Sequence, residues 1–516
     1  MSDSDTTQWD AVVIGSGMGG MTAAAALSKV GHKVLLLEQH QTLGGLTHSF
    51  TRDGFTWDVG VHYLGHMAPG DRERALLGWV CDTPMDFVSL GSIYDTVHIG
   101  SAELSLSRPY EAQEMDLTDR YPDEAEAIRA WTRAMREGQD AVMKIFPTRA
   151  MPEFAGDVLD WWNRRAISKW CARTTREVID DLTDNPELAA VLAAQWGDHG
   201  GRPGRASFAM HALIAGYYLK SGSWYPVGGS AAFAEHMLPT ITGNGGAVRS
   251  ATRVAQLLVE DDAVVGVRTD SGEEIRSSVV ISNIGARETL DTILPEDCGA
   301  RDWKEELQGL PSRIANFNIF LGFEGDIEAA GATRANHWFF PTGDADVVWT
   351  DAPDGPPPHM TVSFGSLKNP AHDPGPRQKH TAQLLFWADW STVAKWADLP
   401  PIDRGEDYAD FKRRAETTLM AAFEERFPEL AKLVVYQNLA TPLSTVSFTG
   451  HRQGAFYGLD VTPERTLCDG LRAKTPVPGL YLSGQDVASP GIPGALWGGM
   501  LSAASVDPKV FRHFQG

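Results

Sequence analysis

The chain has 516 residues, of which 43% are hydrophobic and 22% charged, values typical of a globular protein rather than of a disordered, collagen-like or repeat chain. Its length predicts roughly two or three domains, enough to bury both a cofactor and a ligand. A formal net charge of −22 opposes binding to nucleic-acid phosphates, so we expect no nucleic acid partner.

The first ten residues are polar and acidic and lack the basic and apolar segments of a secretory leader. No segment reaches the roughly 18 apolar residues of a transmembrane helix. The four cysteines are far apart in sequence and form no CxxC pair, so we interpret them as reduced thiols. These features together predict a cytoplasmic protein whose contact with a membrane, if any, is peripheral.

The N-terminal segment predicts a strand, a tight glycine turn, a helix and a second strand. The strand Ala11–Ile14 precedes the turn Gly15–Gly20, a helix is expected over Met21–Val30, and Lys33–Leu37 is the next strand. The turn has the G-x-G-x-x-G spacing that brings backbone close to a pyrophosphate at a helix N-terminus. Glu38 ends the second strand, where a carboxylate binds ribose hydroxyls and repels the 2′-phosphate of NADP.

Further along the chain, three segments predict a three-stranded antiparallel insertion: Arg253–Glu260, Ala263–Thr269 and Glu274–Ile281. Gly479–Leu482 predicts a late strand, and a final helix is expected to start near Ala495. Two tryptophan-rich blocks, about 76 to 222 and about 300 to 440, are helical in pattern.

Five motifs together resemble those of one protein family. They are Glu38 with Gly44-Gly45, then Asp58–Tyr63, then Ser223–Gly229, then Thr441-Pro442 with Gly450 and Tyr457-Gly458, and finally Gly479–Asp486 with Pro490–Ala495. The chain resembles the FAD-dependent phytoene desaturase, carotenoid isomerase and retinol saturase family, within the amine-oxidase-like flavoproteins. Leu46-Thr47 stands where carotene desaturases commonly have a basic residue, whereas His62-Tyr63 resembles the saturase and isomerase branch.

The resemblance implies non-covalent FAD and a set of residues that bind it. Glu38 would bind the adenosine ribose, Val254 would flank the adenine, and Asp486 would meet the ribityl part. The helix after Pro490 would point its N-terminal N–H groups at the flavin ring. The full expected set is Gly15, Ser16, Gly17, Met18, Gly19, Gly20, Glu38, Gln39, Gly44, Gly45, Leu46, Val254, Gly484, Asp486, Gly491, Ile492, Pro493 and Ala495.

Catalytic acid–base residues are harder to identify than cofactor residues. The segments that the resemblance puts near flavin or substrate contain His62, Tyr63, Asp198, His199, His211, Tyr217, Tyr218 and Tyr225. We take His62 and Tyr63 as the catalytic candidates, although such residues are more often structural and hydride chemistry can rely on positioning alone. The pairs His62/His66 and His32/His40 lack a third ligand, so no metal is expected.

Two further features concern partners. No second G-x-G-x-x-G follows a strand, so we expect no dedicated NAD(P)H domain and an external electron donor or acceptor, such as a quinone, oxygen or a reductase. Residues Val158–Trp170 form a basic, aromatic island in an acidic chain. This island predicts either an interfacial helix or an amphipathic helix packed on its own domain, and base rates favour the packed helix.

The sequence therefore predicts an α/β fold in which a Rossmann-like FAD-binding domain is interleaved with a mixed α+β substrate domain. The expected FAD domain comprises residues 9–75, 223–295 and 441–516, and the substrate domain residues 76–222 and 296–440. We expect an oxidoreductase that acts on C–C or C=C bonds of a long apolar substrate of carotenoid, retinoid, isoprenoid or acyl type, by saturation, desaturation or isomerisation. The alternatives are an amine oxidase and a non-enzymatic prenyl- or lipid-binding relative.

Overall fold

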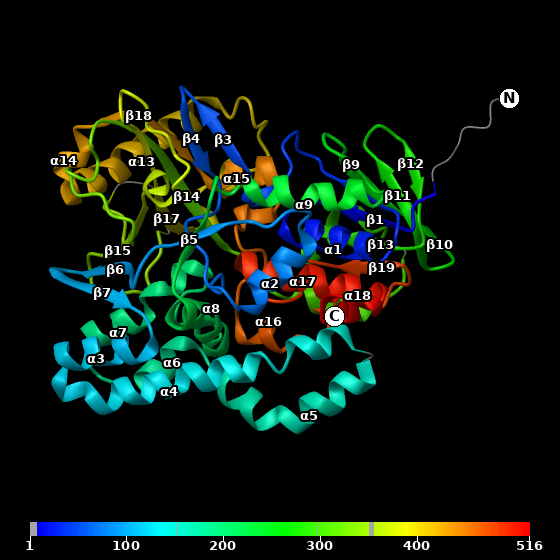
Figure 1. Ribbon diagram of the computed structural model, residues 1–516, viewed down its shortest axis with the longest axis horizontal. Helices are drawn as coiled ribbons and strands as arrows, with labels where there is room; N and C mark the ends of the chain where they lie inside the picture. Colours follow the sequence, from blue (N-terminus) through cyan, green and yellow to red (C-terminus); the bar gives the residue numbers. More distant parts are fainter. Residues whose placement is uncertain (1–7, 152, 297, 350–354, 516) are drawn as a thin grey trace.

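The computed structural model describes residues 8–151, 153–296, 298–349 and 355–515; residues 1–7, most of the acidic N-terminal segment, lie outside these ranges. Two sheets dominate the fold, and they lie in different halves of the molecule (Figure 1). One sheet leads into the glycine turn Gly15–Gly20, and the other sheet lines the candidate active site.

The first sheet is parallel and has five strands. Its order is β19 (Leu480–Leu482), β13 (Val280–Ser282), β1 (Ala11–Ile14), β2 (Val34–Leu37) and β9 (Ala247–Arg249). All four residues of β1 and of β2 are buried, as expected for strands covered on both faces. The parallel sheet of the predicted Rossmann-like domain is therefore confirmed, and the carboxyl ends of β1 and β2 lie side by side because Ile14 pairs with Leu37.

Two helices cross tightly beside this sheet because both carry glycines at the contact. They are α1 (Met18–Lys29) and α17 (Gly491–Val506). A Cβ atom at Gly499 would lie 2.3 Å from the Gly19 carbonyl oxygen, so a larger residue there would push the helices apart. Each helix begins earlier than the sequence predicted, at Met18 instead of Met21 and at Gly491 instead of near Ala495. Glycines in the first turn of each helix lower the helical propensity there, so the sequence pattern did not indicate the first helical residue.

The antiparallel insertion is confirmed with one correction. It consists of β10 (Val254–Glu260), β11 (Ala263–Thr269) and β12 (Glu274–Arg276). The predicted third strand, Glu274–Ile281, is in fact two strands, since Ile281 belongs to β13 and pairs with Val13 in the parallel sheet. Ser277 and Ser278 lie between the two strands in sequence, and the pairing of each part with a different sheet shows where the predicted strand divides.

The second large sheet corrects the helical interpretation of residues 300 to 440. Its order is β18 (Val434–Ala440), β14 (Ile314–Glu324), β17 (Lys379–Asp389), β16 (Met360–Ser363), β15 (Asn336–Phe340), β6 (Ile93–Ile99) and β7 (Ala102–Ser107). The two longest strands, β14 and β17, are buried along almost their whole length. Their sequences therefore lack a simple inside–outside polarity, which is why they were not recognised as strands.

Short strands and helices complete the fold. The strand pairs are β3 (Ser49–Arg52) with β4 (Phe55–Asp58) and β5 (Phe87–Ser89) with β8 (Trp224–Pro226). The remaining α-helices are α2 (Arg72–Val80), α3 (Tyr110–Arg120), α4 (Ala125–Val142), α5 (Glu153–Trp170), α6 (Thr175–Asp180), α7 (Pro186–Ala193), α8 (Phe208–Ser221), α9 (Ala232–Gly243), α10 (Ala286–Glu288), α11 (Arg301–Gln308), α12 (Gly365–Lys368), α13 (Gly405–Arg426), α14 (Pro428–Ala431), α15 (Pro442–Thr449), α16 (Pro463–Leu467) and α18 (Lys509–Gln515).

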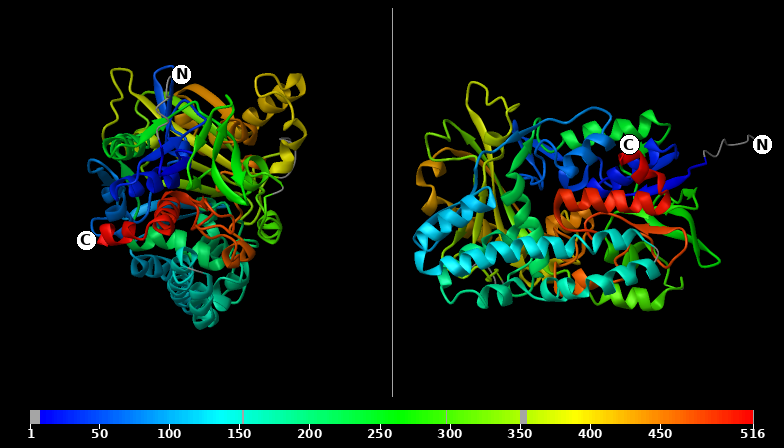
Figure 2. Two further views of the ribbon diagram at one scale, coloured as in Figure 1. Left: turned by 90° about the vertical axis from the view of Figure 1, so that its right-hand side faces the viewer. Right: turned by 60° about the horizontal axis from the view of Figure 1, so that its bottom comes forward.

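Helices α8 and α5 differ sharply in how far they are buried. Helix α8 is buried at all but one of its positions, whereas α5 lies at the outer edge of the helical layer formed by residues 110–220 (Figures 1 and 2).

Among the described residues, none of the helices combines the length and the apolar character needed to span a bilayer.

Candidate active site

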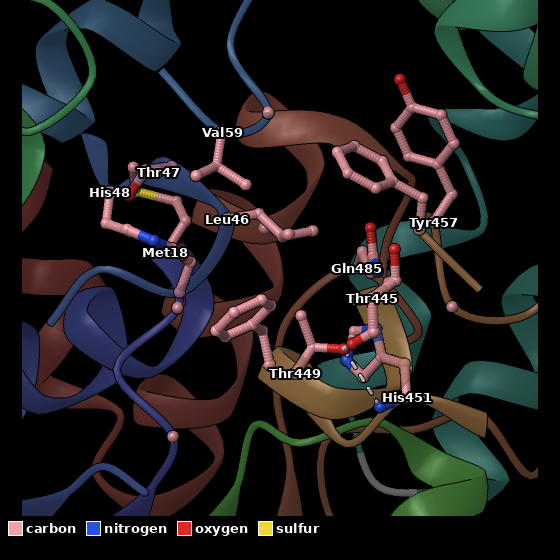
Figure 3. A pocket seen from close by; sticks show the side chains of 18 of the residues that line it. Met18, Leu46, Thr47, His48, Val59, Thr445, Thr449, His451, Tyr457 and Gln485 are labelled. Carbon is pink, nitrogen blue, oxygen red and sulfur yellow. Dashed lines mark hydrogen bonds between the residues drawn. The ribbon is translucent and has the colours of Figure 1, made fainter. Parts of the chain in front are cut away.

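A cavity of about 690 Å³ lies where the glycine turn after β1, the start of α17, helix α8 and strand β14 meet. Its residues come from both sheets, and Figure 3 shows Met18, Leu46 and Val59 on one side of it and Tyr457 on the other. Side chains from far-separated parts of the sequence therefore face a single space.

One wall of the cavity is glycine backbone. Gly15 has a φ of 93°, in the region that favours glycine, and a Cβ at Gly20 would lie 2.0 Å from the Gly15 carbonyl oxygen. A Cβ at Gly19 would lie 2.5 Å from the Cα of Gly484, and one at Gly45 would lie 2.8 Å from the Cα of Gly17. Three glycine segments thus pack backbone against backbone and leave the N-terminus of α1 open to a phosphate group.

The acid at the end of β2 is fixed by its neighbours. The Glu38 carboxylate accepts hydrogen bonds of 2.8 Å from the backbone N–H and hydroxyl of Ser16 and from the backbone N–H of His40. The Gly44 N–H in turn donates to the Ser16 hydroxyl oxygen at 3.0 Å. Glu38 lines the cavity, so its position suits the ribose role that the sequence predicted.

The C-terminal wall is organised by a buried carboxylate. Asp486 accepts from the backbone N–H of Ala286 at 2.8 Å and of Leu459 at 3.1 Å. The fully buried Arg465 lies 3.9 Å from Asp486 and donates to the Gln485 carbonyl at 2.6 Å. These bonds hold the strand end beside the start of α17, whose residues Gly491, Ile492, Pro493 and Ala495 line the cavity.

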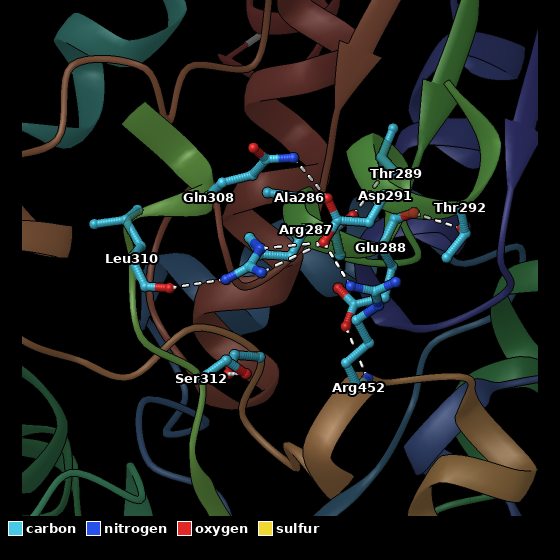
Figure 4. A network of polar contacts seen from close by, with 12 residues as sticks. Ala286, Arg287, Glu288, Thr289, Asp291, Thr292, Gln308, Leu310, Ser312 and Arg452 are labelled. Atoms are coloured by element: carbon cyan, nitrogen blue, oxygen red, sulfur yellow. Dashed lines mark hydrogen bonds and ion pairs between the residues drawn. The ribbon is translucent and has the colours of Figure 1, made fainter. Parts of the chain in front are cut away.

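A polar network joins the helical residues 286–293 to the segment after α15 (Figure 4). Glu288 lines the cavity and accepts from the backbone N–H of Arg452 at 3.0 Å. The Arg452 side chain pairs with Asp291 at 2.9 Å, and Arg287 pairs with the same carboxylate at 3.4 Å. Burial raises the pKa of Glu288. Residues 286–293 are thus tied to the segment after α15.

The far wall is built from α8 and β14. Helix α8 contributes Ile214, Tyr217 and Tyr218, all buried. Along β14, Asn316, Asn318 and Phe320 line the cavity, while the alternate residues Phe317, Ile319 and Leu321 pack into a hydrophobic core. This wall is mostly apolar and aromatic and carries a few amide groups, the composition expected of a small-molecule site.

The two catalytic candidates lie together on the cavity wall. The Tyr63 hydroxyl lies 2.8 Å from Asp95 and 3.0 Å from Asp198. Both ring nitrogens of His62 are buried without a hydrogen-bond partner, and burial lowers the pKa of its imidazole to about 3, so the ring is neutral. The Lys368 ammonium group lies behind them and donates to the His62 carbonyl at 2.9 Å.

The structure separates the acid–base candidates into two groups. His62, Tyr63, Asp198, Tyr217 and Tyr218 line the cavity. His199, His211 and Tyr225 are not among its lining residues. His199 and His211 contact each other at 3.1 Å, and the Tyr225 hydroxyl bonds to Asp58.

Most of the predicted cofactor residues also line the cavity: Gly15, Gly17, Met18, Gly19, Glu38, Gln39, Gly45, Leu46, Val254, Gly484, Asp486, Gly491, Ile492, Pro493 and Ala495. The other three, Ser16, Gly20 and Gly44, lie directly behind it and shape it through the contacts described above.

Sequence reasoning missed several polar residues of the site. Asn283 follows β13 and packs among Gly17, Gly19 and Gly484. Asn316 and Asn318 had a signal, because amides two residues apart in an apolar run indicate one face of a strand. No sequence pattern indicated Asp95 or Lys368, because the residues that they contact are distant in sequence.

The wall fits a flavin nucleotide on observations of this structure. Side chains in place of the glycines would fill the space beside the turn with their Cβ atoms. The buried Ser483 hydroxyl on the cavity wall has no hydrogen-bond partner. A diphosphate would be held by backbone N–H groups, as is usual at a Rossmann turn.

Comparison with known proteins now identifies the family. Residues 18–384 match the family described as flavin containing amine oxidoreductase. The chain belongs to this family. Members carry out redox chemistry with a flavin, so this family member is a flavin-dependent oxidoreductase, and the non-enzymatic alternative is set aside.

Two relatives show which members of the family this chain resembles. An all-trans-retinol 13,14-reductase of Danio rerio is 31% identical over 523 residues, covering 96% of this chain and 86% of that protein. A chloroplastic prolycopene isomerase of Daucus carota is 24% identical over 505 residues, covering 94% of this chain and 77% of that protein. The resemblance to the saturase and isomerase group is therefore confirmed.

Solved structures agree with the fold. Cyclohexylamine oxidase from Brevibacterium oxydans superimposes with a TM-score of 0.63 at 15% identity, covering 98% of this chain and 100% of that chain. At this identity the likeness shows the fold alone. It confirms the predicted combination of a Rossmann-like cofactor domain with a substrate domain.

Proposed function

We propose that the flavin is FAD and that it is bound without a covalent link. The support is the dinucleotide-type turn Gly15–Gly20 followed by Glu38, because FMN has no adenosine ribose to engage that acid. The segments 9–75, 223–295 and 441–516 would form the FAD domain, and all five strands of the parallel sheet come from them. Residues 76–222 and 296–440 would form the substrate domain.

We propose further that the enzyme saturates a C=C bond of a long apolar polyene of the retinoid or carotenoid class. The observation that carries this proposal is the 31% identity with all-trans-retinol 13,14-reductase along 96% of the chain. The cavity is consistent with it, since Ile214, Phe320 and Leu439 offer apolar surface to a ligand. His62 and Tyr63, of which Tyr63 packs against Tyr218 of α8, are proposed to contact the substrate as well.

Electrons are proposed to come from an external donor, such as a reduced quinone or a reductase. The support is that the chain has one G-x-G-x-x-G turn after a strand, which the flavin nucleotide would occupy. The enzyme would therefore alternate between reduction by the donor and oxidation by the polyene.

The enzyme is also proposed to be cytoplasmic and to contact membranes through α5, since an apolar substrate partitions into lipid. Trp161 and Trp162 are 59% and 78% exposed, and Arg164 and Arg165 are exposed beside them. This arrangement suits an interfacial helix, with aromatic rings in the acyl boundary and cations at the head groups. Trp170 and Ile167, at the other end of the same predicted island, are buried in the core, as the packed-helix alternative predicted for this segment.

Anaerobic spectroscopy tests the proposed reaction. Chemically reduced holoprotein mixed with all-trans-retinol is expected to regain the spectrum of oxidised flavin, and a saturated alcohol of matching size should leave it reduced. If retinol and carotenoids all leave the flavin reduced, the proposed function is wrong.

Amine oxidation is the second candidate, because tyrosines line the cavity beside the Asp198 carboxyl group, a setting that can hold a cation. The flavin absorption spectrum also distinguishes amine oxidation from polyene saturation. Oxidised holoprotein should keep its spectrum when mixed with primary, secondary or methylated amines, and bleaching by an amine would favour this second function.

A further inference from the structure

Asp198, Tyr63 and Asp95 form a line of three groups that can exchange a proton, and it runs from the cavity into the protein. Asp198 and Tyr63 both line the cavity. Asp95, on β6, is completely buried behind them and also accepts from the Gln195 side chain at 3.2 Å. The Tyr63 hydroxyl lies within hydrogen-bonding distance of a carboxyl oxygen on each side, at 3.0 Å and 2.8 Å.

The number of protons in this line follows from its geometry. One phenol O–H can donate to only one of the two carboxyl groups at a time. Two ionised carboxylates on either side of one oxygen would repel each other in a site with little water, so one of them holds a proton. Burial and the charge of Asp95 raise the pKa of Asp198 well above its usual value. The proton is therefore held at the cavity end.

Asp95 is the member of the pair with a nearby compensating charge. The Lys368 ammonium group lies 1% exposed among the Ser363 hydroxyl at 2.8 Å, the His62 carbonyl and the Asn336 side chain. Its charge favours ionisation of Asp95, although burial still raises the pKa of that carboxyl to about 7 and lowers the pKa of Lys368 to about 7. Lys368 also acts on Asp198, but less than on Asp95, and the other neighbours of Asp198 are the uncharged side chains of Tyr63, Tyr218 and Tyr457.

Other groups on the wall are poorer proton donors. His62 is neutral, because burial lowers its pKa to about 3. Burial raises the pKa of Tyr217 and Tyr218 further above the already high value of a phenol. Burial also raises the pKa of Glu288, but this carboxyl accepts from the Arg452 backbone N–H and lies beside Gly285, near Asp486 at the cofactor end of the cavity.

We propose that the Asp198 carboxyl group is the proton donor of the reaction and that the Asp95 carboxylate, across the Tyr63 hydroxyl, keeps the proton on Asp198. This role rests on the proposed function. Bound reduced flavin would supply the hydride for one carbon of the C=C bond. The O–H bond of Asp198 breaks, a C–H bond forms at the neighbouring carbon, and Asp198 is left as a carboxylate. After the product leaves, the Asp198 carboxylate takes a proton from water that enters the cavity, which restores the acid.

The test compares Asp198→Asn with Asp116→Asn, an exposed aspartate that likewise accepts from one hydroxyl, that of Ser107. Reduced, FAD-loaded protein is mixed anaerobically with all-trans-retinol and flavin reoxidation is followed. Loss of a general acid slows transfer by about 10²- to 10⁴-fold. Asp198→Asn is expected to show this loss with normal FAD content and normal retinol binding, Asp198→Glu to recover part of the rate, and Asp116→Asn to match wild type.

The pH profile gives a readout that a structural role would not change. The wild-type rate should fall as pH rises through the pKa of Asp198, and the residual rate of Asp198→Asn should not. The neighbouring groups that face this carboxyl, Asp95, Lys368, Tyr63, Tyr218 and Tyr457, remain in the variant and serve as an internal control for their own titration.

Infrared spectra of the oxidised holoprotein test the protonation without turnover. A component of the protonated-carboxyl band at neutral pH should disappear in Asp198→Asn and persist in Asp116→Asn. The inference is overturned if the band is unchanged, or if Asp198→Asn reoxidises at the wild-type rate while wild type reduces retinol. If wild type itself transfers nothing to retinol or to carotenoids, the proposed function fails and this role fails with it.

Discussion

Ser16 contacts Glu38 twice: its backbone N–H and its hydroxyl both donate to the same carboxylate oxygen, each at 2.8 Å. Since Gly44 donates to the Ser16 hydroxyl, the glycine turn, the acid after β2 and the double glycine are joined by one set of hydrogen bonds. The acid is thus held in position at the cavity before a ligand arrives, which reduces the entropy cost of binding.

Replacing Glu38 should weaken FAD binding. Hydrogen bonds to a charged group contribute roughly 1.5–3 kcal/mol each, so Glu38→Gln is expected to raise the Kd for FAD by about 10- to 150-fold. Glu38→Arg should weaken it further, because a cation meets the N–H groups of Ser16 and His40. Equilibrium dialysis measures the effect. Glu273→Gln, at an exposed acid paired with Arg249, is the matched control and should bind FAD normally. Unchanged binding by Glu38→Arg would remove the ribose assignment.

Arg465 should position the C-terminal wall through Asp486. Arg465→Met leaves a buried carboxylate without its cation and the Gln485 carbonyl without a donor, a loss that typically costs about 3–5 kcal/mol. We expect a lower Tm and a reduced flavin content. Arg276→Met, which removes an exposed ion pair with Glu260, should change neither. Equal Tm values for the two variants would show that the buried pair is not structural.

Stability should fall on acidification because buried histidines are neutral in the folded protein. Burial lowers the pKa of His359 to about 4, whereas the unfolded side chain titrates near 6.5. Between these values the unfolded state binds more protons, so stability is complete above pH 6.5 and declines as pH falls toward 4, by roughly 3 kcal/mol for this residue.

Thermal unfolding across this pH range tests the His359 contribution. In His359→Gln the side-chain oxygen can still accept from the Trp387 N–H, as the imidazole does at 3.0 Å, but no proton is taken up. The variant should therefore lose less Tm than wild type between pH 6.5 and pH 4. Parallel curves for the two proteins would contradict a neutral buried imidazole at this position.

The exposed tryptophans of α5 should carry any membrane contact. Trp161→Asp combined with Trp162→Asp should abolish co-sedimentation with anionic liposomes at low salt while leaving flavin content intact, because carboxylates are costly in the acyl boundary. Trp170→Asp is the contrasting variant: its ring is buried and its N–H donates to Glu137, so misfolding is expected. Wild-type protein that stays wholly in the supernatant would end the membrane proposal.

The cofactor half was predictable from sequence because its signals are local. Gly15, Gly17 and Gly20 lie within one turn, and Glu38 follows the next strand, so spacing alone predicts a shared site. The C-terminal residues around Asp486 came from the family resemblance. Their contacts with Ala286 and Leu459 join segments about 200 and 27 residues away, which no local pattern encodes.

The substrate half was less predictable for two physical reasons. Strand β14 is buried on both faces, so its apolar run does not distinguish a strand from a helix. Asp95, Asp198 and Lys368 are polar residues whose role arises only when β6, the turn before His199 and α12 meet. The same long-range packing buried Trp170 while it left Trp161 exposed, although the two look alike in sequence.

Mass analysis of the polyene after one anaerobic turnover tests the central claim most directly. Holoprotein with one equivalent of reduced flavin is mixed with all-trans-retinol, and the organic extract is examined. The account predicts a product two hydrogen atoms heavier than retinol, in an amount equal to the flavin that was oxidised. Retinol and carotenoids recovered unchanged, or recovered only as isomers of the same mass, would contradict it.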